Sequence, residues 1–297
     1  MAQPLLARLK QSGATLHVLA PAWVEPVLRR MPEVDEVIAA PFRHGPLQLG
    51  ERWRLGRSLK RRGYDSAIVL PNTWKSALVP FLAGIPKRIG YVGESRYGLL
   101  NSLHRKEPLP MARHYARLGG ESGAALSSPH LEVSAEEVGE TRRRFGLEGA
   151  YTVFCPGAEY GPAKRWPYFG ELAARITGPV VLLGSKNDAP AAAGIPARNL
   201  VGQTTLDEAI RLIAGAAAVV SNDSGLMHVA AALGRPLVAL FGSSSPEHTP
   251  PLSPRARVLW LRIECSPCYE RECPLGHFRC MREMTVETVL DQLKTLS

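Results

Sequence analysis

The segment from Val219 to Pro246 constrains the fold of this chain more than any other. An apolar run ends at the polar loop Ser221–Gly225, a helical pattern begins at once, and a second apolar run follows from Pro236 to Phe241. Strand, loop, helix and strand in this order are typical of a parallel sheet with helices packed on its faces. The helix then begins at the carboxyl edge of the sheet, where unpaired N–H groups and the helix dipole bind anionic groups such as phosphates.

Apolar runs alternate with helical patterns along all 297 residues, of which 45% are hydrophobic. This alternation predicts an α/β protein with two doubly wound domains, residues 1–146 and 147–297. Two such domains side by side form a cleft, which is the usual place for a ligand. The first domain opens on a helical pattern at Gln3–Ser12, so we expect it to lack the strand with which such a domain normally begins.

The second domain has the more regular pattern. Its expected strands are Tyr151–Cys155, Pro179–Leu183, Asn199–Val201, Ala217–Ser221, Pro236–Phe241 and Arg257–Leu261. Its expected helices are Tyr168–Ile176, Leu206–Ala214, Leu226–Leu233 and Val286–Leu296, and the first domain has a clear helical pattern at Trp74–Leu82. The short strands alternating with helices indicate a parallel sheet.

Basic residues are concentrated in the first half of the chain. Residues 1–150 carry 22 Lys and Arg against 14 Asp and Glu, whereas residues 151–297 carry 14 against 13. Arg43–Arg62 alone contains seven basic side chains and one acid, Glu51. Such a surface suits an anionic substrate or the anionic face of a membrane, and the alternative is a solvated helix face.

Several classes of protein are disfavoured. No apolar run reaches the length of a membrane span, and the N-terminus lacks the layout of a signal peptide, so we expect a cytoplasmic protein. No G-x-G-x-x-G motif follows an expected strand, which argues against a nicotinamide-dependent oxidoreductase. The basic residues match no nucleic-acid reader motif, so nucleic acid is not an expected partner.

The loop Phe154–Pro167 follows an expected strand and precedes a helix. Gly157 and Gly161 allow the backbone to approach a ligand closely, and Lys164 is a mobile charge suited to phosphate. The alternative is an ordinary connection between strand and helix with a surface lysine. The residues alone leave both interpretations open.

Other candidate residues follow neighbouring strands at the same edge. Asp188 can accept hydrogen bonds from a ribose diol, or it can cap the helix that follows. Thr204, in the turn after the next strand, can line a base pocket or simply start a helix. His228, in the first turn after Gly225, and Asp223, just before that helix, each have a structural alternative, as a packed histidine and as a helix cap.

Four of the five cysteines form a cluster near the C-terminus, C-x2-C-x4-C-x6-C, with His277 among them. Such a density of thiols can bind zinc or an iron–sulfur cluster, although the spacing fits neither standard zinc pattern well. Reduced free thiols in a packed loop are the main alternative, and disulfides formed by oxidation are another. Cys155, inside an expected strand, is expected to belong to the core. The clustered residues are Cys265, Cys268, Cys273 and Cys280.

In these motifs, the chain resembles the ADP-heptose:lipopolysaccharide heptosyltransferases of glycosyltransferase family 9. Within this family, the resemblance is greater to the heptosyltransferases of type II than to those of type I. The resemblance covers essentially the whole chain. It is carried by PGAEYGPAKRWP (156–167), SNDSGLMHVAAALGRPLVALFG (221–242), LPNTWKSALVPFLAGIPKRIGY (70–91), RYGLLN (96–101) and CSPCYERECPLGHFRC (265–280).

The resemblance implies a GT-B fold, in which two Rossmann-like domains face each other across a cleft. The C-terminal domain would hold ADP-heptose, and the N-terminal domain would hold the lipopolysaccharide inner core. The donor-binding residues implied are Lys164 at the diphosphate, Asp223, Ser224 and Gly225 at the helix start, Asp188 at the ribose, and Gly157, Thr204 and His228 nearby. The acceptor-binding residues implied are Asn72, Lys75 and Arg96.

The resemblance also implies the reaction. Family members transfer the sugar with inversion by direct displacement, and the chemistry requires no bound cofactor or metal. They begin with a strand and a Gly-Asp loop just before the segment that matches Met1–Gln3, and that aspartate is the family's proposed general base. This sequence does not contain it, so no catalytic residue is assigned. Two explanations are open: the start codon is placed too late, or the chain is truly truncated. The alternative functions are a catalytically impaired nucleotide-sugar-binding fragment and a GT-B transferase that uses another sugar nucleotide. Contact with the inner face of the inner membrane is a further expectation.

Overall fold

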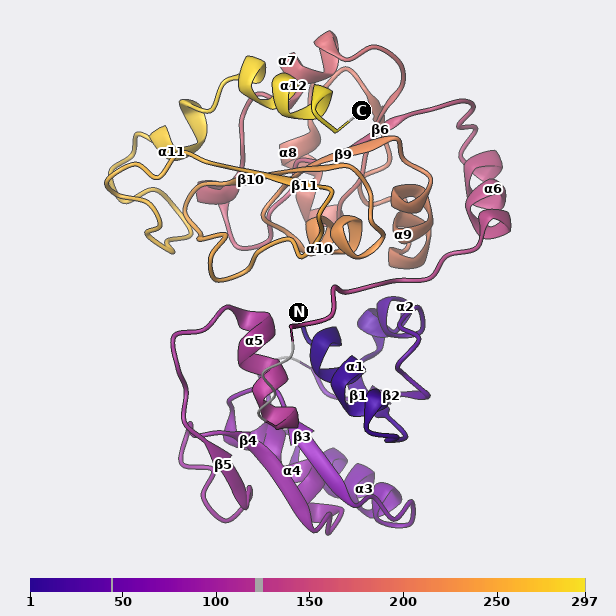
Figure 1. Cartoon of the computed structure of the whole chain (residues 1–297), viewed down its shortest axis with the longest axis vertical. Helices are drawn as coiled ribbons and strands as arrows, with labels where there is room; N and C mark the ends of the chain where they lie inside the picture. Colours follow the sequence, from indigo (N-terminus) through magenta and orange to yellow (C-terminus); the bar gives the residue numbers. More distant parts are fainter. Residues whose placement is uncertain (44, 121–124, 297) are drawn as a thin grey trace. The chain divides into compact units, whose positions relative to one another are not determined.

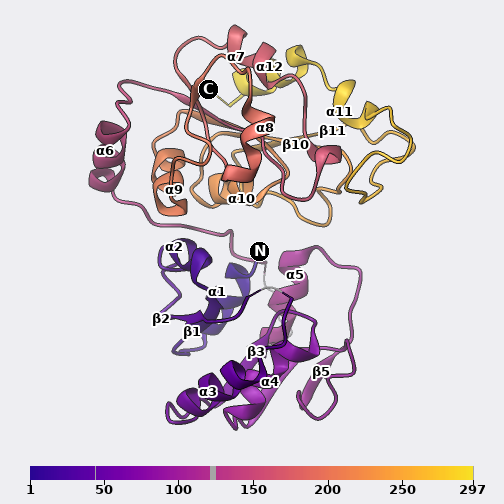
Figure 2. The same cartoon turned by 180° about the vertical axis from the view of Figure 1, so that it is seen from behind.

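The named strands of the computed structural model all pair in parallel, as the alternation of strands and helices predicts. The model describes residues 1–43, 45–120 and 125–296. These divide into two units (Figures 1 and 2). Unit 1 comprises Met1–Glu25 and Glu33–Ser127, and unit 2 comprises Pro26–Pro32 and Ser128–Ser297. No helix of the described residues is long and apolar enough to span a membrane.

Unit 1 contains two small parallel sheets. One has the order β1-β2 and the other β3-β4-β5, with β1 (His17–Pro21), β2 (Glu36–Ala40), β3 (Ser66–Val69), β4 (Lys87–Tyr91) and β5 (Ser102–His104). Its helices are α1 (Gln3–Gln11), α3 (Leu49–Lys60), α4 (Trp74–Leu82) and α5 (Met111–Ala116), with 3-10 turns η1 (Ala22–Val24) and η2 (Arg117–Gly119). The short helix α2 (Glu25–Leu28) lies where the chain passes into unit 2.

The first element of unit 1 is the helix α1, as the sequence predicts. Within the described residues, β1 pairs only with β2, and β3 pairs only with β4. Nδ1 of His17, at the start of β1, nevertheless lies 2.8 Å from the hydroxyl of Tyr64, two residues before β3. This hydrogen bond links the two small sheets at this end. Among the described residues, the outer strands of each sheet, β1 and β2 in one and β3 and β5 in the other, have no further strand partner.

Unit 2 is built on one six-stranded parallel sheet with the order β11-β10-β9-β6-β7-β8. The strands are β6 (Thr152–Cys155), β7 (Val180–Leu182), β8 (Arg198–Asn199), β9 (Ala218–Asn222), β10 (Leu237–Phe241) and β11 (Ala256–Trp260). The chain runs outward from β6 through β7 to β8 and returns on the other side of β6 as β9. The loops after β6 and β9 therefore diverge, which is where doubly wound sheets bind ligands.

Helices cover both faces of this sheet (Figure 1). One face carries α9 (Leu206–Ala214) and α10 (Gly225–Ala232), and α6 (Ala135–Arg144) packs next to α9. The other carries α7 (Phe169–Arg175), α8 (Ala189–Ala192), α11 (Arg279–Arg282) and α12 (Val286–Lys294), with 3-10 turns η3 (Pro162–Lys164) and η4 (Lys186–Asp188) in the loops.

Side-chain alternation along the strands supplies two cores. In β9, Val219 packs against α9 and α10, whereas Val220 packs into the core on the opposite face. Both side chains are fully buried. Because a central strand of this sheet is covered on both faces, its sequence is a continuous apolar run rather than an alternation of apolar and polar residues. The helix α6 lies in unit 2, and the domain boundary at residue 146 stays a prediction.

Candidate functional site

Lys164 and Asp223 form an ion pair at the point where the loops after β6 and β9 diverge. Lys164 ends the turn η3, and Asp223 is the first residue after β9. Nζ of Lys164 lies 2.5 Å from Oδ2 of Asp223, and both side chains are largely buried. Ser244, from the loop after β10, donates its hydroxyl to the same oxygen at 2.6 Å. Three strand ends therefore contribute to one polar cluster.

The helix α10 begins directly beside this pair. Ser224 is its N-cap, and the Ser224 hydroxyl accepts from the N–H of Met227 at 3.5 Å. Gly225 is exposed, and a Cβ placed on it would meet nothing within 4 Å. The first turn of α10 therefore faces open space, and its backbone N–H groups carry the positive end of the helix dipole.

A buried asparagine holds the Lys164 loop in place. Asn222, the last residue of β9, is fully buried. Its Oδ1 accepts from the backbone N–H of Trp166 at 3.1 Å, and its Nδ2 donates to the carbonyl of Pro156 at 2.8 Å. The side chain thus bridges both ends of the loop that carries Lys164. Sequence reasoning did not single out Asn222, although its position directly before Asp223 was a signal.

Gly161 fixes the same loop from the other side. A Cβ on Gly161 would lie 2.3 Å from the carbonyl oxygen of Arg271. That carbonyl also accepts from the N–H of Ala163 at 3.0 Å. Any larger residue at position 161 would force the η3 turn away from the segment around Arg271, so close approach explains this glycine.

Asp188 serves as a local cap and also lies against the β6 loop. Its Oδ2 accepts from the backbone N–H of Ser185 at 2.9 Å and from the Ser185 hydroxyl at 2.7 Å. A Cβ on Gly157 would stand 2.2 Å from Oδ1 of Asp188. The structure therefore brings the two residues together. The Asp188 carboxylate closes the capping box of η4 with Ser185, but at the N-cap position of α8, the helix that follows, it makes no capping hydrogen bond. Thr204 is half-buried after β8, and its neighbour Thr205 forms the capping box of α9 with Glu208.

His228 lies in the first helical turn of α10 and is half-buried. Burial is the largest cause that lowers the pKa of His228 to about 4. Of the two nearby charges in unit 2, Asp223 acts to raise this pKa, and Lys164 acts more weakly to lower it. The imidazole is therefore neutral near pH 7. In this state it can donate or accept a hydrogen bond, but it adds no positive charge to the site.

In unit 1, two of the expected acceptor-binding residues share one cluster. Arg96 is buried, and its guanidinium donates to the carbonyls of Pro71 (2.5 Å) and Tyr91 and to Oδ1 of Asn72 (3.3 Å). Desolvation by burial lowers the pKa of Arg96. Arg96 therefore holds the loop that carries Asn72, and contact with an acceptor stays a prediction for all three residues.

Lys75 lies apart from that cluster, in the first turn of α4. Its Nζ donates to the carbonyl of Gly45 at 2.8 Å. Arg52 of α3 donates through Nη1 to the carbonyl of Lys75 at 2.9 Å and through Nε to the carbonyl of Leu47 at 2.6 Å. The start of α4 and the segment before α3 are thus fastened to each other.

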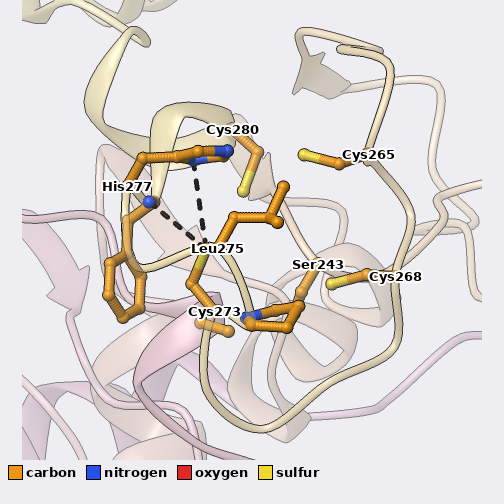
Figure 3. Close-up of a pocket in the computed structure, with 10 residues that line it drawn as sticks. Ser243, Cys265, Cys268, Cys273, Leu275, His277 and Cys280 are labelled. Carbon is orange, nitrogen blue, oxygen red and sulfur yellow. Dashed lines mark hydrogen bonds between the residues drawn. The ribbon is translucent and has the colours of Figure 1, made fainter.

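The four clustered cysteines line one pocket together with Ser243 and His277 (Figure 3). All five cysteines of the chain are free thiols. Sγ of Cys273 accepts from the N–H of Phe278 at 3.4 Å and lies 4.0 Å from Nδ1 of His277. Within the described residues, no three His, Cys, Asp or Glu side chains are arranged to hold a metal ion. The pocket therefore presents converging thiols rather than a formed metal centre.

Comparison of the sequence with known proteins identifies the family of this chain. The model of "Glycosyltransferase family 9 (heptosyltransferase)" matches residues 52–279. Lipopolysaccharide heptosyltransferase 2 of Escherichia coli K12 is 46% identical over 98% of this chain and 92% of that protein. Lipooligosaccharide heptosyltransferase 2 of Haemophilus influenzae Rd is 40% identical over 97% of this chain and 92% of that protein.

Solved structures agree with the sequence comparison. The E. coli ADP-heptose lps heptosyltransferase II superposes with a TM-score of 0.88 at 43% identity, covering 99% of this chain and 93% of that chain. The E. coli heptosyltransferase WaaC with ADP has a TM-score of 0.70 at 19% identity, covering 100% and 95%. The second match shows a shared fold. The α/β architecture with parallel sheets is thus that of the GT-B heptosyltransferases.

Proposed function

The chain belongs to glycosyltransferase family 9, the heptosyltransferases, and from this premise we propose that it transfers a heptose from ADP-L-glycero-D-manno-heptose to the heptose of the lipopolysaccharide inner core. The observation that carries the proposal is the 46% identity to lipopolysaccharide heptosyltransferase 2 over 98% of the chain. The Lys164–Asp223 pair supports the proposal, because it lies at the switch point of the sheet in unit 2, where doubly wound sheets bind ligands.

The diphosphate of the donor binds at the start of α10. Backbone N–H groups at Ser224 and Gly225 donate to phosphate oxygens, and Lys164 supplies a compensating charge. Negative charge develops on this diphosphate as ADP leaves. A preorganised donor aimed at such a charge is typically worth about 3 kcal/mol in the transition state.

The nucleoside lies along the carboxyl ends of β6, β7 and β8. Asp188 binds the ribose diol through the carboxylate that lies against Gly157. Thr204, in the turn after β8, lines the base pocket. Gly157 acts on the donor through Asp188, because the space that a Gly157 side chain would fill holds the Asp188 carboxylate.

The reaction is an inverting displacement. The acceptor heptose hydroxyl attacks the anomeric carbon, the bond from that carbon to the diphosphate oxygen breaks, and ADP departs with the electron pair. A base that takes the hydroxyl proton typically contributes about 10²–10⁴-fold. We assign that role to no described residue. The neutral His228 contributes hydrogen bonding at the sugar-diphosphate.

The acceptor binds to unit 1. Lipopolysaccharide inner-core sugars carry carboxylates and phosphates, which suit the basic excess of residues 1–150. Lys75 and Asn72 contact the acceptor, and the buried Arg96 positions Asn72. The enzyme works in the cytoplasm at the inner face of the inner membrane, and nucleic acid is not a partner.

The test is a transfer assay with ADP-heptose and a heptose-terminated inner-core acceptor, in which mass spectrometry detects the product. A panel of other sugar nucleotides, matched in concentration, tests the donor. Product with ADP-heptose alone supports the proposal. Binding of ADP-heptose without product would indicate a nucleotide-sugar-binding fragment, and product with another donor would reassign the specificity.

A further inference from the structure

Helix α3 of unit 1 presents an aromatic and basic face to solvent. Leu49 and Trp53 are 54% and 50% exposed and lie about one helical turn apart, so they form one apolar patch. Arg57, one helical turn beyond Trp53, lies with its guanidinium 5.1 Å from the centre of the indole ring. Lys60 continues the same stripe, so two apolar side chains are followed by two cationic ones along one side of the helix.

The opposite side of α3 is firmly packed. Gly56 is buried against α4, because a Cβ there would lie 2.6 Å from Cβ of Leu82. Leu59 joins a core with Val79 of α4, and Arg52 is held by the carbonyls of Leu47 and Lys75. Helix α3 is therefore fixed against α4 (Figure 2), and its exposed face contributes little to the core of unit 1.

The charges on this face are uncompensated. Arg62, just past the helix, pairs with Glu36, and the only acid of the segment, Glu51, accepts from Nε2 of Gln48 at 2.5 Å. No carboxylate of the described residues forms an ion pair with the remaining basic side chains of the face. These are Arg54, Arg57, Lys60 and Arg61.

We propose that this face of α3 docks on the surface of an anionic lipid bilayer. The docking face consists of Leu49, Trp53, Arg54, Arg57, Lys60 and Arg61. A bilayer surface matches both halves of its chemistry, because lipid phosphates attract the cations while the interfacial region accepts the indole and the leucine. Nucleic acid would leave the leucine exposed, and the acceptor sugars would leave both apolar side chains without a partner. The inference deepens the proposed function, because an acceptor anchored in the bilayer would be reached by an enzyme held on that surface.

The test is co-sedimentation of the full chain with lipid vesicles. We expect binding to vesicles of phosphatidylcholine with 30% phosphatidylglycerol, weak binding to phosphatidylcholine alone, and a steep loss of binding as salt is raised. Each neutralised basic residue should lower the partition coefficient about fivefold, and Arg54→Glu with Arg57→Glu should lower it more than 25-fold. Arg143→Glu, a reversal of an exposed arginine on α6, is the matched control and should bind like the wild type.

The aromatic contribution is tested separately. Trp53→Ser should lower the partition coefficient at any salt concentration and should remove most of the tryptophan quenching by brominated phosphatidylcholine in anionic vesicles. Trp23→Ser, at a 72% exposed tryptophan of η1, is its control. Equal binding of wild type and α3 variants would overturn the proposal. Equal binding to neutral and anionic vesicles, or tighter α3-dependent binding to DNA than to vesicles, would overturn it as well.

Transfer assays separate this inference from the proposed function. Arg54→Glu with Arg57→Glu should leave transfer to a water-soluble inner-core oligosaccharide unchanged and should reduce transfer to the same core anchored in vesicles. Vesicle binding by a wild-type chain that makes no product would contradict the proposed function and leave the docking face standing. Equal loss with both acceptors would place these arginines at the acceptor and contradict the docking.

Discussion

Nζ of Lys164 lies 2.5 Å from Oδ2 of Asp223, and the two residues reach each other from the ends of neighbouring strands, β6 and β9. Both side chains are largely buried, so each charge is balanced by the other when no ligand is bound. A diphosphate at the start of α10 would compete with Asp223 for the lysine. The pair therefore holds the Lys164 side chain near the start of α10, where a diphosphate, with its greater negative charge, can replace Asp223 as the partner of the lysine.

Replacement of Lys164 by alanine should lower kcat for heptose transfer by about 10²–10³-fold, because one preorganised donor to the leaving group is lost. The substitution also leaves Asp223 buried beside the diphosphate, which should weaken donor binding. Product formation and the thermal midpoint are measured together. Lys294→Ala, at an exposed lysine of α12, should change neither. Unchanged turnover in Lys164→Ala would remove the lysine from the site.

Replacement of Gly157 by alanine should raise KM for the donor about tenfold or more, because the new methyl group would overlap the Asp188 carboxylate. The carboxylate would have to move away from the position we assign to the ribose. Gly170→Ala is the matched control, since its Cβ would meet only Pro196 at 4.0 Å and alanine favours the helix α7. Equal donor KM values for both variants, with an intact fold, would argue against the ribose role of Asp188.

The elements that sequence predicted well are those with long, regular patterns. The helices at Trp74–Leu82 and Leu206–Ala214 occur with the predicted bounds, and all six strands of unit 2 were expected within a few residues. The strand β5 and the helices α8 and α11 were not predicted. Each has only three or four residues, which is too short for a hydrophobic period to emerge.

The candidate site shows a similar division. The loops with Lys164 and with Asp223 were recognisable because Gly and polar residues follow apolar strands, and the sheet order brings them together. The roles of Asn222 and Ser244 depend on contacts between residues far apart in the chain, which no local pattern carries. The burial of Arg96 was also invisible, because an arginine beside a turn is usually solvated.

The cysteines should differ in reactivity toward iodoacetamide at pH 7.5. Burial tends to raise the pKa of Cys273, but hydrogen bonds from the N–H groups of Phe278, Leu275, His277 and Gly276 outweigh it, and the net shift is downward. Burial raises the pKa of Cys155 to about 12, and burial with the neighbouring thiols raises that of Cys280 to about 11. Because the thiolate is the nucleophile, Cys273 should be alkylated first, and Cys155 and Cys280 should stay unmodified.

Peptide mass spectrometry over a time course measures this order. The denatured protein is the control, since all five cysteines should then react at similar rates. Labelling of Cys280 as fast as Cys273 in the folded protein would show that the pocket in Figure 3 opens in solution.

A network around Arg30 should make unit 2 sensitive to acid. Arg30 is buried and donates to Glu137 at 2.8 Å and to Asp207 at 2.7 Å, both on helices of unit 2. The hydrogen bonds from Arg30 and then from the N–H of Ser134 lower the pKa of Glu137 to about 2. Because the pKa is depressed in the folded state, the stabilisation is present above about pH 4.5 and is lost as the pH falls toward 2.

Glu137→Gln should therefore lower the free energy of unfolding at pH 7 by about 1 kcal/mol, since the carboxylate is partly solvated and its charge is screened. The difference from the wild type should shrink between pH 4.5 and pH 2, because the wild-type carboxyl becomes protonated in that range. Urea unfolding at pH 7, 4 and 2.5, followed by circular dichroism, measures this. Glu140→Gln, at an exposed residue of the same helix α6, should match the wild type at each pH. A difference between Glu137→Gln and wild type that stays constant with pH would mean that the charge of Glu137 contributes nothing, and that packing around Arg30 alone holds α6 against α9.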